Sequence, residues 1–397
     1  MLKVTMWLVV PSFYQGDLLR ALVATGELDL EVIFARPLSD DRIELGWKND
    51  VAGYSYRFLN EKNRIWDAVR LVWSQRERIH IVNGMWMEPS FAAALATLAA
   101  IGSTYAIYSE APDPSVSRSG AKKLCTTVFG RMIVARASGF FPVSHFGVAF
   151  FRRLGAQSQN TYPYGYFRSH ASPLANSTKC NDDDQDRIEI AFVGQVVHRK
   201  GIDLLLDAIK PLFGEHPTLY LIIIGMGDSL ESIQRQVESL GLMERISFEG
   251  VLPSDQVLSR LRNADLLVLP SRWDGWGIVI NEAFAVGIPV VVSNRCGASE
   301  LVRDGINGYV FHSEDVMNLR SCLQRFLTNK EDWAGLRTAS ARTGERISAE
   351  AIAPYLVESL KHMISNVDES PTAPWIQLGE AESAVGQGLD RLSSERP

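Results

Sequence analysis

The chain has 397 residues, of which 46% are hydrophobic and 22% charged, and its formal net charge is −6. This length exceeds what one hydrophobic core usually supports, so we expect two domains. No apolar run approaches the roughly 20 residues that cross a bilayer, and no cleavage site follows the short apolar N-terminal segment. The four cysteines lie far apart without a C-x-x-C pair, which argues against a disulfide framework or a zinc site. We therefore expect a cytoplasmic chain that binds no metal and no nucleic acid.

Short apolar, β-branched segments alternate with helical stretches in the first part of the chain. They lie at 4–10, 30–35, 79–84, 104–109 and 139–144. The same alternation resumes at 188–194, 219–225, 245–250, 265–271 and 288–294. Such alternation predicts an α/β fold with two Rossmann-like, doubly wound parallel-sheet domains. Ligands of such sheets bind beyond the carboxyl ends of the strands, and we expect the site in an interdomain cleft.

A polar stretch divides the two sets of strands and predicts the domain organisation. The predicted parts are an N-terminal domain at 1–168, a linker at 169–187, a second domain at 188–348, a helix at 349–368 and a polar tail at 369–397. One option for the helix is that it packs back on the first domain. The tail is too polar to build a core, so we expect it to be loose.

A basic stretch lies at 118–137 within the first predicted domain. It contains five Lys or Arg residues and no acid, interleaved with Val128, Phe129, Met132 and Ile133. One interpretation is a helix that rests on an anionic membrane surface. The other is a core-facing helix with a solvated basic side.

The stretch 271–294, "SRWDGWGIVINEAFAVGIPVVVSN", combines acids and glycines at a strand–turn–helix junction. Gly275 and Gly277 allow backbone N–H groups to approach a ligand, which favours a phosphate site beside the helix start. Glu282 lies about one turn inside the helix, where its carboxylate can accept from sugar hydroxyls. Asp274 stands at the entrance of the turn, so we expect it to face the substrate.

The pattern D-G-W-G-x4-E-A-x-A-x-G-x-P-V-V resembles the E-x7-E signature of retaining nucleotide-sugar glycosyltransferases of family four, which have the GT-B architecture. Four further segments of the chain occur in the order expected for that family: "FVGQVVHRKGIDLLLDA", "LIIIGMGD", "ISFEGVLPSDQVLSRLRNADLLVLPS" and "ELVRDGINGYVF". The resemblance covers residues 188–345 almost throughout. The N-terminal half is similar more loosely, through "PVSHFGVAFFRRLGA" and "YPYGYF".

The resemblance implies that Glu282 binds the nucleotide ribose and that Lys200 neutralises phosphate. It also implies that the turn around Gly275 touches the diphosphate and the sugar, with no metal or other cofactor. A fixed cation and backbone donors would stabilise the charge that a leaving diphosphate develops. The implied donor-binding residues are Gly194, Gln195, Arg199, Lys200, Gly275, Trp276, Gly277 and Glu282.

Three positions depart from the family pattern. Asp274 stands where the family usually has glutamate, and Gln195 where it commonly has arginine, with Arg199 available to compensate. Glu110 takes the place of a histidine that faces the transferred sugar in many relatives. Glu110 is thus a candidate sugar contact or general base, together with Asp274 and Glu282 as catalytic candidates. On the acceptor side, Tyr14, Gln15 and Gly16 occupy the place of a glycine-rich loop.

Each of these residues also has a structural interpretation. Glu282 and Lys200 can be solvated surface groups, and Asp274 can cap the following helix. Glu110 can pair with Arg118 or Lys122, and Trp276 can be a packing residue.

The sequence therefore predicts a retaining glycosyltransferase that moves a sugar from a UDP-, GDP- or ADP-linked donor to a glycan or lipid-linked acceptor. The expected setting is the synthesis of cell-surface polysaccharide or lipopolysaccharide, at the inner face of the membrane. The alternatives are a nucleotide-sugar epimerase of GT-B fold and a catalytically weak nucleotide-sugar-binding protein.

Overall fold

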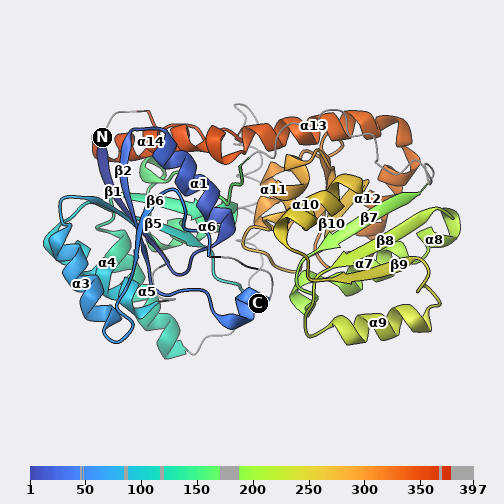
Figure 1. The fold of residues 1–397 in the computed structure, drawn as a ribbon, viewed down its shortest axis with the longest axis horizontal. Coiled ribbons are helices and arrows are strands. Elements are labelled where there is room, and N and C mark those ends of the chain that lie inside the picture. The colour runs from blue at the N-terminus through green and yellow to red at the C-terminus, as the bar shows by residue number, and fades with distance from the viewer. Residues whose placement is uncertain are drawn as a thin grey trace. The chain divides into compact units, whose positions relative to one another are not determined.

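The computed structural model describes residues 1–44, 47, 49–84, 88–116, 120–169, 187–365 and 369–376. The chain separates into two compact units (Figure 1). The first unit comprises 1–39, 48–167 and 349–397, and the second comprises 40–47 and 168–348. Each unit is built around one six-stranded sheet in which the paired strands run parallel.

The sheet of the first unit has the strand order β3-β2-β1-β4-β5-β6. Its strands are β1 (Leu2–Leu8), β2 (Leu28–Phe34), β3 (Ser55–Phe58), β4 (Ile79–Asn83), β5 (Tyr105–Glu110) and β6 (Gly139–Val143). Strand order reverses at β1, because the chain first moves outward to β3 and then crosses to β4. The carboxyl ends of β1 and β4 therefore mark the position where ligands of open α/β sheets bind.

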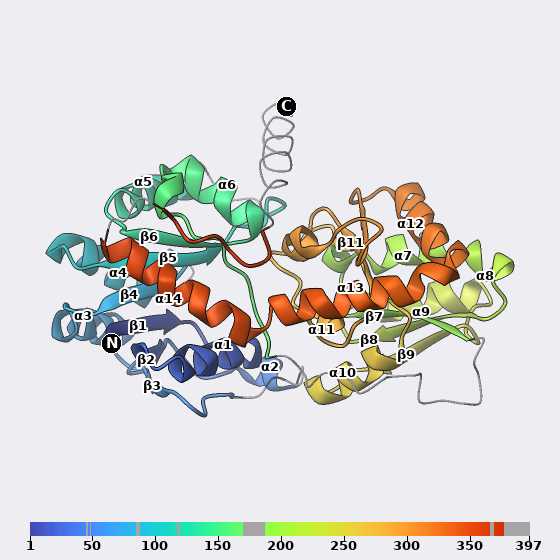
Figure 2. The same cartoon turned by 90° about the horizontal axis from the view of Figure 1, so that it is seen from above.

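Helices cover both faces of this sheet. They are α1 (Phe13–Ala24), α3 (Arg64–Ser74), α4 (Pro89–Ile101), α5 (Gly120–Val134), α6 (Ser144–Leu154), the short η1 (Ser158–Asn160) and α14 (Ala349–Ser365). Right-handed crossovers put α3, α4 and α5 on one face and α1 on the other. Buried side chains of α3, α4, α5 and α6 share one core cluster with Trp7 and Tyr105. On the opposite face α14 packs beside α1 (Figure 2).

The sheet of the second unit has the order β12-β11-β10-β7-β8-β9. Its strands are β7 (Ile188–Val193), β8 (Leu219–Ile224), β9 (Ile246–Gly250), β10 (Leu266–Leu269), β11 (Val290–Ser293) and β12 (Gly308–Phe311). Its helices are α2 (Asp40–Glu44), η2 (His198–Lys200), α7 (Ile202–Ile209), α8 (Leu212–Glu215), α9 (Leu230–Ser239), α10 (Ser254–Asn263), α11 (Val279–Ala285), η3 (Gly297–Leu301), α12 (Val316–Thr328), η4 (Lys330–Asp332) and α13 (Trp333–Arg346). The two sheets confirm the predicted α/β fold with two Rossmann-like domains.

The structure adds two edge strands that the sequence analysis did not predict. All four residues of β3 are exposed, so this strand lacks the apolar run by which the others were found. Strand β12 is only four residues long and follows a turn. The exposure of β3 and the shortness of β12 leave each strand without a long apolar run.

The unit boundaries differ slightly from the predicted domain boundaries. Arg168, which was placed in the first domain, groups with the second unit. Residues 170–186 of the predicted linker lie outside the described residues. The helix expected at 349–368 is α14, which groups with the first unit. Of the segment 369–397, which was expected to be loose, the described part packs on this unit: Ala373 is buried and Trp375 lies 5.0 Å from the Phe167 ring.

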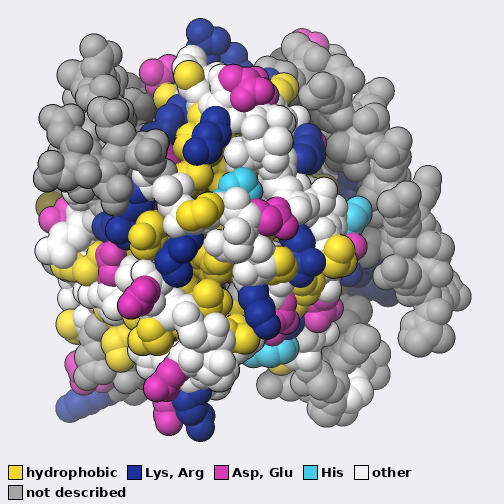
Figure 3. Space-filling model, turned by 90° about the vertical axis from the view of Figure 1, so that its right-hand side faces the viewer, with side chains coloured by type: hydrophobic (Ala, Val, Ile, Leu, Met, Phe, Trp, Pro, Cys, Tyr) yellow, Lys and Arg dark blue, Asp and Glu magenta, His cyan; other side chains and the backbone are white. Residues whose placement is uncertain are grey.

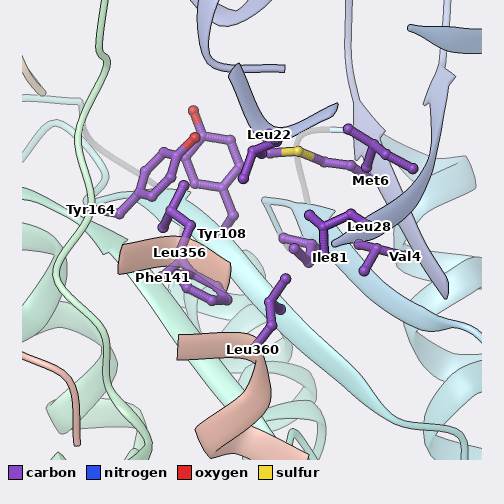
Figure 4. Close-up of a pocket in the computed structure, with 11 residues that line it drawn as sticks. Val4, Met6, Leu22, Leu28, Ile81, Tyr108, Phe141, Tyr164, Leu356 and Leu360 are labelled. Carbon is purple, nitrogen blue, oxygen red and sulfur yellow. The ribbon is translucent and has the colours of Figure 1, made fainter. Parts of the chain in front are cut away.

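A small apolar cavity lies in the first unit between the sheet and helices α1 and α14 (Figure 4). Its volume is about 20 Å³, and its lining includes Met6, Leu22, Ile81 and Leu356. The hydroxyl groups of Tyr108 and Tyr164 point away from the aliphatic side chains. Since the lining offers no polar group to a water molecule, we interpret the cavity as a dry packing gap rather than a binding site.

Within the described ranges, no helix combines the length and the hydropathy needed to pass through a membrane. The same ranges hold no cluster of three His, Cys, Asp or Glu side chains that could bind a metal ion.

Candidate functional site

Two neighbouring strands of the second unit bring the predicted donor-side residues to one edge of the sheet. β7 ends before Gly194, and the loop that follows contains η2 with Arg199 and Lys200. β10 ends at Leu269 and leads through the turn 270–278 into α11. Because β7 and β10 pair in parallel, their carboxyl ends lie side by side, and so do these two loops.

Glycines allow the backbones of these loops to come into contact. A Cβ on Gly225, after β8, would lie 1.9 Å from the carbonyl oxygen of Gly194. A Cβ on Gly201 would lie 2.1 Å from the carbonyl oxygen of Pro270. Both glycines also have positive φ, which other residues adopt at a cost. The loop that carries Lys200 is therefore held close to the turn after β10.

Lys200 and Asp274 form an ion pair at the centre of this site. Lys200 Nζ donates to Asp274 Oδ2 at 2.5 Å, and only 13% of each side chain is exposed. The pairing shows that Asp274 does not cap α11, whose N-cap is Ile278. A cation and an acid held this close can both contact a ligand that carries a phosphate and a hydroxyl group.

The turn from Asp274 to Ile278 is fixed by the segment after β11. Gly297 N donates to Asp274 O at 3.0 Å and Ala298 N donates to Trp276 O at 2.7 Å. Among the residues that the structure describes, the N–H groups of Gly275 and Gly277 donate to no acceptor. Two backbone donors near the Lys200 ammonium group could form an anion-binding site.

Trp276 and Cys296 pack beneath this turn. The Trp276 ring is buried, and its Nε1 donates to Asn281 Oδ1 at 2.8 Å, so the ring itself cannot be a sugar platform. A Cβ on Gly277 would lie 2.6 Å from Cys296 Sγ. Burial, reinforced by Asp274, raises the pKa of the Cys296 thiol well above its usual value. Cys296 is therefore a packing residue and not a nucleophile.

Glu282 lies in the first turn of α11 and is buried. Arg168 Nη1 donates to Glu282 Oε1 at 3.1 Å and to Ser254 Oγ at 3.2 Å. Burial raises the pKa of the Glu282 carboxyl group, while the positive charge of Arg168 acts in the opposite direction. Glu282 is thus not the solvated surface carboxylate of the alternative interpretation.

Arg199 and Gln195, the two remaining donor-side candidates, are placed differently. Arg199 Nη1 donates to Trp273 O at 2.8 Å, so its guanidinium group bridges the two loops. Arg272 N donates to Arg199 O at 2.9 Å and reinforces this bridge. Gln195 is exposed. Of the pair, Arg199 has the more defined structural position.

In the first unit, Glu110 ends β5 and accepts a hydrogen bond from the Tyr166 hydroxyl group. The Tyr166 ring lies 5.1 Å from Tyr14 and 6.3 Å from Tyr108. Gln15 Nε2 in turn donates to Tyr108 Oη at 3.3 Å. Burial raises the pKa of both Tyr108 and Tyr166, so these hydroxyl groups stay protonated and can donate. Of the predicted alternatives for Glu110, Arg118 lies outside the described residues, as does the side chain of Lys122.

Tyr14, Gln15 and Gly16 lie in the first turn of α1 and not in a glycine-rich loop. A Cβ on Gly16 would meet Asp50 Oδ2 at 2.5 Å. Asp50 is itself bound by Arg20, whose Nη1 lies 2.7 Å from Asp50 Oδ1. Gly16 therefore has a packing role, whereas Tyr14 and Gln15 belong to the aromatic group around Glu110.

Two residues of these sites were not found from the sequence. Arg168 contacts a carboxylate 114 positions away, and Tyr166 contacts one 56 positions away. Both belong to the segment "YPYGYFRS", of which only "YPYGYF" was noted, as a loose resemblance to the family. Its three alternating tyrosines were the available signal.

The family described as Glycosyl transferases group 1 matches residues 177–343, which form most of the second unit. A GDP-mannose-dependent alpha-(1-6)-phosphatidylinositol monomannoside mannosyltransferase of Mycolicibacterium smegmatis is 32% identical over 161 residues, which are 39% of this chain and 42% of that protein. A glycogen synthase of Mycobacterium tuberculosis is 31% identical over 172 residues, or 39% and 41% of the two chains. The chain thus spans about two fifths of the length of these relatives.

Solved structures are similar over both units. Anabaena Alr3699/HepE in complex with UDP has a TM-score of 0.73 at 16% identity, covering 91% of this chain and 100% of that one. The lipopolysaccharide outer core galactosyltransferase WaaB has a TM-score of 0.66 at 17% identity, covering 92% and 99%. At such identities the likeness concerns the fold, which is that of GT-B structures.

Proposed function

We propose that this chain, whose second unit matches the glycosyl transferases group 1 family, transfers a sugar from a nucleotide-diphosphate donor to a glycan or lipid-linked acceptor with retention of anomeric configuration. One observation carries the proposal most directly. A buried carboxylate, Glu282, lies at the same sheet edge as the Lys200–Asp274 pair and the Gly275 turn. A ribose, a diphosphate and a sugar require these three kinds of contact.

The donor chemistry follows from these contacts. Glu282 accepts from the ribose hydroxyl groups, since a buried acceptor gains most from a paired donor. Lys200 and the N–H groups of Gly275 and Gly277 bind the diphosphate and stabilise the charge it develops as it leaves. Asp274, held by Lys200, orients the transferring sugar. The donor base stays open: the M. smegmatis relative is named as GDP-mannose-dependent, and the Anabaena structure contains UDP.

We assign acceptor recognition to the first unit, where Glu110, Gln15 and the tyrosine hydroxyl groups supply hydrogen-bond partners. Aromatic rings with hydroxyl groups suit a sugar, which has both polar and apolar edges. The relative from M. smegmatis is named for a lipid acceptor and WaaB for lipopolysaccharide outer core. We extend this to a membrane-linked acceptor and a role in cell-surface glycan synthesis.

Thermal unfolding with UDP, GDP, ADP and their sugars tests the donor site. One nucleotide at 100 times its Kd is expected to raise the unfolding free energy by about 2.7 kcal/mol. Glu282→Ala should abolish most of this shift. Glu238→Ala, which removes an exposed acid of α9 in the same unit, is the control and should retain it.

The absence of any nucleotide effect on the wild-type chain would contradict the donor site. Release of free nucleotide only when an acceptor glycan is present would identify a transferase. Acceptor-independent conversion of the donor would instead favour the epimerase, which the similar proteins do not favour. Binding without turnover would favour the weak binding protein.

A further inference from the structure

Two tryptophans on α3 are exposed on the side of the helix opposite to its buried residues. Trp66 is 70% exposed and Trp73 is 53% exposed, whereas Ala68, Leu71 and Val72 are buried. Trp66 and Trp73 are seven positions apart, or about two helical turns, so they share one face with Arg70 between them. Tryptophan is large and apolar enough that exposing two on one helix face marks an interaction surface.

Helix α5 presents a second face of the same kind. Val128 is 61% and Met132 is 44% exposed, and Arg131 is exposed beside them. Ile133 and Val134 face the core instead. The charges along this stretch have one sign, since 118–137 contains five basic residues and no acid.

Helix α4 lies between them in the same helical layer and packs against both α3 and α5. The sequence 89–102, which includes α4, contains no charged residue. Its outer positions, Ala92, Ala93, Ala96 and Thr97, are half-buried, so they add small apolar surface. We call the exposed residues of this layer the α3–α5 face: Trp66, Arg70, Trp73, Val128, Arg131 and Met132.

We propose that the α3–α5 face docks on the surface of a bilayer that contains anionic lipid. Tryptophan rings sit at the interface between headgroups and acyl chains, and arginines beside them bind anionic headgroups. A second copy of the chain is a poorer partner for this face, because the arginines of two identical faces would repel each other. By contrast, the surface of the second unit in Figure 3 intersperses basic, acidic and apolar side chains.

Co-sedimentation of the full chain with vesicles tests this surface. Phosphatidylcholine vesicles with added phosphatidylglycerol are expected to bind the chain, and pure phosphatidylcholine to bind it at least about tenfold more weakly. Trp66→Ser with Trp73→Ser should lower binding by about tenfold or more, because the apolar insertion is lost. Arg70→Gln and Arg131→Gln should each lower it by about fivefold, and added salt should reduce binding further.

The matched control changes Met243 and Met317 of the second unit, which are 53% and 65% exposed, to serine. This variant should bind vesicles as the wild type does. All variants should keep the wild-type nucleotide shift, so failure of this surface and failure of the donor site are distinguishable. Equal binding by the double tryptophan variant would overturn the proposal. So would a wild-type dimer in sedimentation velocity that the same variant converts to a monomer.

Discussion

The two units build their candidate sites from different interactions. In the second unit, charged groups meet in ion pairs of low exposure: Lys200 with Asp274, and Arg168 with Glu282. In the first unit, one carboxylate, Glu110, accepts from a tyrosine hydroxyl group among rings that meet at tilted and edge-on angles. Under the proposed function, the first arrangement suits a charged, diphosphate-containing ligand, and the second suits a neutral one with many hydroxyl groups. The same sheet architecture would then carry two kinds of recognition.

The two units also differ in what their glycines contact. In the second unit Gly225 meets a backbone carbonyl, which cannot move without disturbing β7. In the first unit Gly16 meets the end of the Asp50 side chain, which Arg20 binds but which can shift more easily than a backbone carbonyl. At these two positions the glycine thus contacts backbone in the second unit and a side chain in the first.

The largest expected effect tests this difference in packing. Gly225→Ala should lower the free energy of unfolding by about 3 kcal/mol or more, because the new Cβ overlaps Gly194 O and φ is positive. Gly16→Ala should change it by less than about 1 kcal/mol. Gly241→Ala, with positive φ but open space around it, isolates the cost of φ at about 1 kcal/mol. Denaturant titration measures all three, and a similar loss for Gly16 and Gly225 would break the contrast.

Acid should act on the first unit through His80. His80 is buried, Trp7 Nε1 donates to its Nδ1 at 3.1 Å, and burial lowers its pKa to about 4 from 6.5. Between pH 6.5 and pH 4, His80 is therefore protonated in the unfolded chain and neutral in the folded chain. The free energy of unfolding is thus highest above pH 6.5 and decreases toward pH 4. The loss should reach about 3 kcal/mol.

Thermal unfolding between pH 7 and 4.5 measures this loss. His80→Gln should flatten the pH dependence, and His145→Gln, which changes an exposed histidine of the same unit, should leave it unchanged. An unchanged slope in His80→Gln would assign the acid sensitivity to other groups.

A smaller effect of opposite sign is expected in the second unit from Arg168→Gln. Without this cation the pKa of the buried Glu282 rises further, so the folded chain holds a proton that the unfolded chain releases. Stability should then fall as pH rises, by about 1 to 3 kcal/mol at pH 8 relative to the wild type. Arg168→Lys should keep most of the stability. Adding Glu282→Gln to Arg168→Gln should remove the pH dependence, and its persistence would contradict the pairing.

Much of the fold follows from local sequence patterns. Buried parallel strands such as β1 and β8 are continuous apolar runs, and each was predicted to within two residues of its observed bounds. The edge strands β3 and β12 were missed, because β3 is exposed throughout and β12 is only four residues long. The loose tail was predicted from the polarity of 369–397; in its described part, 369–376, Ala373 is buried and Trp375 lies against Phe167 and Tyr355.

The sequence by itself determined the two α/β units, the positions of Lys200 and Asp274 after strand ends, and the position of Glu282 near the start of a helix. These depend on neighbouring residues, since strand ends and turns are encoded locally by apolar runs and glycines. Only the tertiary structure decided which polar and charged side chains contact each other. Arg168 reaches Glu282, Tyr166 reaches Glu110 and Lys200 reaches Asp274 across long stretches of chain. Pairing across such separations depends on strand order and on burial, which raises the free energy of an unpaired charge until a partner is found.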